Sequence, residues 1–248
     1  MTALLRAEAR KTVTTRSTLA VVGAVVAYPA LGLLPAVLAA GAPAVDEGTL
    51  LAVLRGGADV VVIAALLLGI LAAAGEYRHG TIVPILLVAP RRERFVAAKL
   101  GSQAALAAVL ALAVSAVGLL AGGWYLAGRD VSVRVLSADV LGTVGAVVLV
   151  ASLYATIGAA VGALVRNQTA AVAGALIWVL AVENVVPLVL RSPGLKRWLP
   201  GGAVDRLLHV ADPLAGTGGP WAALVALAGL TAVLAAGAAL FTRSADVR

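Results

Sequence analysis

Long apolar stretches separated by short polar connections dominate the chain. A stretch of about 18 or more apolar residues with almost no charge can cross a bilayer as a helix. The sequence has six such stretches, and we predict a membrane-spanning helix in each: 18–40, 58–75, 95–126, 138–165, 169–190 and 221–241. The pattern therefore predicts an all-α integral membrane fold, with residues 1–248 forming a single transmembrane domain.

Composition supports this class of protein. Apolar residues make up 62% of the 248 residues and charged residues 12%, whereas a soluble domain is about half apolar and a quarter charged. The first stretch is too long for the apolar region of a signal peptide, and it contains Pro29 and Pro35. The chain has no cysteine, which excludes disulfides and thiolate metal sites.

The basic residues indicate how the helices are oriented. Membrane proteins concentrate Arg and Lys at the cytoplasmic ends of their helices. If the N-terminus is cytoplasmic, the predicted inner segments hold twelve Arg and Lys residues and the outer segments hold seven. We therefore predict that both termini are cytoplasmic, and we attribute the net charge of +7 to this bias and not to a nucleic-acid partner.

Two segments outside the predicted spans are amphipathic. Residues 1–16 combine apolar and charged positions and predict a short helix on the inner membrane surface. Residues 191–219 interleave apolar and charged positions, and Pro193 and Pro200 divide them. We predict one or two short amphipathic helices there, forming an outer re-entrant segment before the sixth span, with Trp198 as an interfacial anchor.

The connection between the second and third spans carries the most information about function. Charged residues open and close it, and an apolar run at 81–88 lies between Gly80 and Pro90. This run is far too short to span a bilayer. It can pack on the inner membrane surface, or it can dock as a helix into a groove on a partner protein. The residues themselves leave both alternatives open.

The order of several motifs resembles the type-2 ATP-binding-cassette (ABC) exporter permeases. The connection resembles the coupling-helix region of that family, which has an acidic residue, Gly-Thr, an apolar run, Pro-x-x-Arg and then Lys-Leu. The matching positions are Glu76, Gly80-Thr81, 82–88, Pro90 with 91–94, and Lys99-Leu100. The N-terminal segment, the Arg166-Asn167-Gln168-Thr169 turn and the outer segment before the sixth span are similar as well, so the resemblance covers essentially the whole chain.

The resemblance implies a transport function. Such a subunit has no ATPase of its own, and this chain has no phosphate-loop motif. ATP and Mg would bind to a separate ABC ATPase subunit, and a second permease copy or a paralogue would complete a homodimer or heterodimer in a bacterial cell membrane. The implied ATPase-coupling residues are Glu76, Arg78, Gly80, Thr81, Ile82, Ile85, Leu86, Pro90, Arg91 and Arg92.

A few polar residues and glycine patterns lie in the predicted spans. Glu183 is the main ionisable residue within one, and it either lines a substrate path or pairs with the outer segment, for instance with Arg191 or Arg197. We expect Asp59 and Asp139 to lie at helix ends. The small-residue patterns Gly158–Gly162 and Gly118–Gly122 favour packing within the chain over a dimer seam.

Other classes of protein fit less well. The two histidines, His79 and His209, lie on predicted opposite sides of the membrane, and Ser115 and Ser152 have no histidine at their depth, so we do not expect an enzyme. A stand-alone secondary carrier or channel usually has charge near mid-membrane, and this chain has almost none there. A non-transporting membrane scaffold stays open as an alternative.

Overall fold

The computed structural model describes residues 16–32, 47–78, 92–128, 137–191, 193–208 and 219–244. All regular secondary structure in these ranges is helical. The long helices are α2 (Arg16–Gly32), α4 (Glu47–Arg78), α6 (Arg92–Ala127), α7 (Ala138–Val165) and α11 (Pro220–Ser244). The shorter ones are α8 (Gln168–Ile177), the π-helix η1 (Trp178–Val182), α9 (Glu183–Val189), the 3₁₀ helix η2 (Pro193–Trp198) and α10 (Pro200–Leu208).

Five helical segments in the described residues are long and apolar enough to cross a membrane. They are Gly48–Arg78, Phe95–Ala127, Ala138–Val165, Gln168–Val189 and Pro220–Thr242. This confirms the prediction of a helical, membrane-type architecture. The first predicted span begins in α2, which has 17 residues. The rest of that span, 33–40, lies outside the described residues, so the sixth crossing, the position of the termini and the surface helix at 1–16 stay predictions.

The helix boundaries predicted from the sequence agree best with the structure at α7, where a capping side chain marks one end and a left-handed residue marks the other. The predicted span 138–165 coincides with α7. The Ser137 Oγ accepts a hydrogen bond from the Val140 N–H at 3.3 Å and caps the first turn. At the other end Arg166 has a φ of 56°, which takes the backbone out of the helix.

The second span was predicted too short. Helix α4 begins at Glu47, well before Ala58, because Arg55 and the Gly56-Gly57 pair interrupt the apolar run without interrupting the helix. Our expectation that Asp59 lies at a helix end is therefore wrong, since this residue lies well inside α4. Asp139 lies in the first turn of α7, as expected, where its charge suits the helix dipole.

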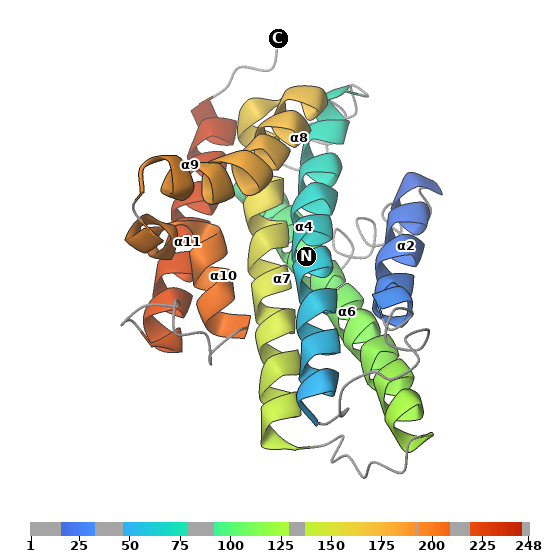
Figure 1. Ribbon diagram of the computed structural model, residues 1–248. Helices are drawn as coiled ribbons and strands as arrows, with labels where there is room; N and C mark the ends of the chain where they lie inside the picture. Colours follow the sequence, from blue (N-terminus) through green and yellow to red (C-terminus); the bar gives the residue numbers. More distant parts are fainter. Residues whose placement is uncertain are drawn as a thin grey trace.

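Helices α4 and α7 form the centre of the molecule (Figure 1) and pack on each other more extensively than any other pair. Glycines allow this close approach: a Cβ at Gly158 would collide with the Leu66 carbonyl oxygen, and a Cβ at Gly69 with that of Ala155. Near the far end of α6, a Cβ at Gly122 would lie 2.7 Å from Leu50 Cδ1 of α4. Both small-residue patterns thus serve packing within the chain, as predicted.

The outer surface of this bundle is apolar. Trp124 is 79% exposed, Leu188 76% and Val225 70%. Soluble proteins rarely expose contiguous apolar surface of this kind, whereas a helix that contacts lipid requires it. The distribution of exposed side chains therefore supports the membrane assignment independently of helix length.

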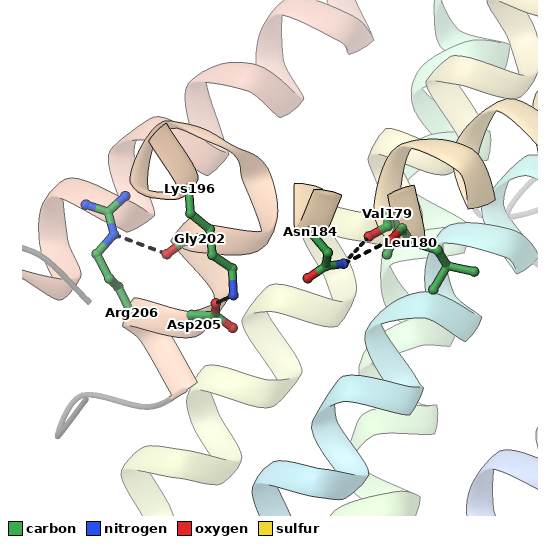
Figure 2. A network of polar contacts seen from close by, with 7 residues as sticks. All are labelled: Val179, Leu180, Asn184, Lys196, Gly202, Asp205 and Arg206. Carbon is green, nitrogen blue, oxygen red and sulfur yellow. Dashed lines mark hydrogen bonds and ion pairs between the residues drawn. The ribbon is translucent and has the colours of Figure 1, made fainter. Parts of the chain in front are cut away.

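The fifth predicted span is not a regular α-helix. Figure 1 shows α8 and α9 lying across the upper end of the bundle at a steep angle to α7. Between them the π-helix η1 shifts the hydrogen-bonding register, and the Asn184 amide donates to the Val179 and Leu180 carbonyls at 2.9 and 3.3 Å (Figure 2). The chain then continues through η2 and the amphipathic α10, which packs against α11 and α7. These are the short helices predicted for 191–219.

Candidate functional site where α4 and α6 meet

A buried ion pair joins the two helices that flank the connection 79–91. The Lys99 Nζ of α6 lies 2.7 Å from the Glu76 Oε1 of α4, and both side chains are at least nine-tenths buried. The Lys99 ammonium also lies 5.5 Å from the centre of the Phe95 ring. Removing one member of a buried ion pair leaves the other charge without compensation, so each of these two residues requires the other where α4 meets α6.

A second polar contact group lies near the same end of the bundle, at the turn between α7 and α8. The Arg166 guanidinium lies 4.4 Å from the centre of the Phe241 ring of α11 and 5.4 Å from that of Tyr77 of α4. The Arg78 side chain donates to Gln168 Oε1 at 3.3 Å. These contacts link α4, α7, α8 and α11 beside the ion pair, so five helices are joined around this end of α4.

The structure describes only part of the predicted coupling set. Glu76 is buried near the end of α4, Arg78 is its exposed last residue, and Arg92 begins α6. The remaining members lie outside the described residues: Gly80, Thr81, Ile82, Ile85, Leu86, Pro90 and Arg91.

Glu183 lies apart from this group, at the junction of η1 and α9. Its Oε1 accepts a hydrogen bond from the Trp178 Nε1 at 2.8 Å, and the main chain of Gly201 also bonds its carboxylate. A Cβ at Gly201 would collide with Oε2, so a larger residue there would displace the Glu183 carboxylate. The described hydrogen bonds of Glu183 thus come from Trp178 and from Gly201 at the start of α10, within the segment where a partner was predicted; the side chain of Arg197, one of the two arginines suggested, lies outside the described residues.

Sequence reasoning missed two parts of this arrangement. Lys99 was noted only as part of a motif, although a lysine inside a long apolar stretch suggests a buried partner, and Glu76 is the acid at the facing helix end. The stacking of Arg166 on Phe241 had no signal in the sequence, because the two residues are distant along the chain and meet only when α11 packs on α7.

The fold and this site define a helical protein of the multi-pass membrane type. Within the described residues, no three His, Asp or Glu side chains gather into a group that could hold a metal ion. Comparisons of the sequence with known protein families and with curated proteins find no match.

Proposed function

We propose that this chain is the membrane-spanning permease subunit of an ABC exporter in a bacterial cytoplasmic membrane. A separate ABC ATPase subunit binds ATP and Mg and supplies the energy, and a second permease copy or a paralogue completes the translocation pathway. The observation that carries the proposal is the buried Glu76–Lys99 ion pair at the base of the connection 79–91.

The ion pair gives this connection a mechanical role. The two ends of the connection are held near each other, because α4 ends at Arg78, α6 begins at Arg92, and the ion pair joins these two helices. A force on the connection therefore moves α4 and α6 together instead of separating them. This is what a docking segment needs if a partner ATPase is to drive spanning helices.

The glycine contacts carry such a movement further into the bundle. Gly158 and Gly69 bring the backbones of α7 and α4 so close that neither helix can slide without the other. The Arg166 contacts with Tyr77 and Phe241 add α11 to the same unit. A movement of the connection 79–91 would thus displace most of the described helices together.

Copurification tests the proposal. Tagged wild-type protein, extracted in a mild detergent, should retain an ATPase that contains a phosphate loop. The double variant Ile85→Glu, Leu86→Glu should lose it, because two charges on the apolar run prevent docking into a groove.

The matched control places the same change on the predicted other side of the membrane. The variant Val131→Glu, Val133→Glu, in the connection between α6 and α7, should retain the ATPase. If no such ATPase accompanies wild type, or if both double variants lose it equally, the proposal is wrong.

A further inference from the structure

Gln103 is a buried polar side chain in the middle of the membrane-type helix α6. It is 1% exposed, and among the groups of the described ranges neither its side-chain oxygen nor its side-chain nitrogen has a hydrogen-bond partner. A buried amide without hydrogen bonds is costly, above all among apolar helices. The Gln103 amide therefore requires a partner that can both donate and accept hydrogen bonds.

A small cavity borders the same side of α6. Its volume is about 20 Å³, and residues of α4, α6, α7 and α11 line it. A long side chain in a helix leans over the residues three and four positions before it. For Gln103 these residues are Leu100 and Lys99, and both line the cavity. The amide is thus directed toward the side of α6 that the cavity borders.

The wall of this cavity combines small apolar side chains with polar groups. Ala73 of α4 and Ala159 and Ala163 of α7 leave the space open, because none of them extends beyond its Cβ. The polar lining comes from three helices and includes both members of the buried ion pair: Glu76, Tyr77, Lys99 and Thr242. A polar molecule in the cavity would therefore meet hydrogen-bonding groups on more than one side.

The size and charge of the cavity select its occupant. A water molecule needs about 10–15 Å³ of such space and two to four polar partners, whereas sites for small organic molecules have volumes of about 300 Å³ or more. Glu76 and Lys99 lie 2.7 Å apart and carry opposite charges, so together they offer no net charge to hold an ion. Water fits, and it both donates and accepts.

We propose that this cavity binds an internal water molecule, which bridges the Gln103 amide and the polar groups beside the Glu76–Lys99 ion pair. The water satisfies the amide and extends the polar contact of the ion pair by one turn along α6. This binding is independent of the transport proposal, because it requires no ATPase and no transported substrate.

NMR spectroscopy of the glutamine side chains tests the site directly. The chain has two glutamines, Gln103 and Gln168, so protein labelled selectively with ¹⁵N-glutamine in detergent micelles gives two pairs of side-chain amide signals. The variant Gln103→Leu assigns them. We expect cross-relaxation peaks between water and the Gln103 amide protons. Their signs should be opposite in nuclear Overhauser and rotating-frame spectra, which distinguishes a long-lived water from proton exchange.

A matched pair of variants locates the water. Ala163→Val narrows the cavity and should remove the water peaks of Gln103. Ala116→Val, on the exposed side of α6 and outside the cavity, should keep them.

Oxygen-17 relaxation of the solvent provides a second measurement that does not depend on protons. It is needed because the Lys99 ammonium and the Tyr77 and Thr242 hydroxyls line the cavity and could relay proton signals from bulk water. Wild type should show a long-lived water that is missing in Gln103→Leu and in Ala163→Val and present in Ala116→Val.

Two results would overturn the proposal, and neither depends on the folding of Ala163→Val. The first is the absence of water peaks at the Gln103 amide in folded wild-type protein. The second is an equal oxygen-17 contribution from long-lived waters in wild type and in Gln103→Leu.

Discussion

Glu76 and Lys99 illustrate how single side chains decide the behaviour of this membrane protein. Each would place a full charge among apolar helices, which is costly for an isolated group. At 2.7 Å they compensate each other. The exposed pair Lys196–Asp205 has the same separation, yet its side chains are 46% and 37% exposed, so water competes for both charges.

The two ion pairs should respond differently to substitution. Glu76→Ala should lower the free energy of unfolding by about 3–5 kcal/mol, because Lys99 keeps a buried charge. Lys196→Ala should cost less than about 1 kcal/mol. Replacing both buried members, with Glu76→Leu and Lys99→Met, should recover much of the loss. Thermal unfolding in detergent measures all three, and similar small shifts for both single variants would contradict this account.

Sequence reasoning reached some of these residues and not others. Glu183 was identified because charge is rare within an apolar span, whereas Glu76 and Lys99 were noted as positions of the motif in the connection between the second and third spans. Their partners depend on which helix faces which, and hydropathy does not contain that information. The bond between Trp178 and Glu183 also depends on the local π-helical register, so the sequence suggested a partner from the outer segment and missed the one nearby.

At the scale of helices, close packing of α4 on α7 is the main feature. Gly69 lies on one helix and Gly158 and Gly162 on the other, and each faces the backbone of its neighbour. Such contacts allow extensive dispersion attraction between helices in a bilayer, where no hydrophobic effect drives association. A methyl group added at one of these glycines would meet the backbone of the facing helix, which cannot move aside as a flexible side chain could.

Two alanine substitutions in α7 test the seam. Gly158→Ala should destabilise the protein by about 1–3 kcal/mol, because its Cβ meets the Leu66 carbonyl and α4 must shift. Gly142→Ala, in the same helix, meets nothing within 4 Å and should be neutral or stabilising by up to about 1 kcal/mol. Thermal unfolding of the two variants compares them, and equal effects would exclude a special role for the seam.

Helix existence was easier to predict than helix regularity. The span 138–165 was predicted with its ends because the apolar run itself begins and ends there, and in the structure the Ser137 cap and the turn at Arg166 lie at these two points. The π-helical segment Trp178–Val182 was not predicted. An apolar run has the same hydropathy pattern whether its backbone hydrogen bonds are α-helical or π-helical. Asn184 did not indicate this π-helix in the sequence either, although its side-chain amide donates hydrogen bonds to carbonyls of the segment.

At the scale of the whole molecule, orientation in the membrane determines what the connection 79–91 can meet. Arg and Lys counts predict both termini inside, which places this connection in the cytoplasm. The fold is compatible with that orientation, because the ends of α4 and α11 lie near each other at the top of Figure 1. The cytoplasmic side itself stays a prediction.

Single-cysteine labelling tests the orientation, and the natural chain has no cysteine to interfere. Ser132→Cys should react with a membrane-impermeant maleimide in intact cells. Asp246→Cys should react only after the membrane is permeabilised. The reverse pattern would place 79–91 outside the cell, where no ATP-driven partner could reach it.

The central claim is that the connection 79–91 docks on an ATPase, and site-specific crosslinking measures this contact most directly. A photoreactive amino acid at Leu86, with the same group at Val131 as control, is irradiated in intact membranes, and the products are identified by mass spectrometry. Our account predicts that Leu86 captures a protein with a phosphate loop and that Val131 does not. Crosslinks from Leu86 to lipid or to the same chain alone would contradict it, and would favour a helix that simply packs on the inner membrane surface.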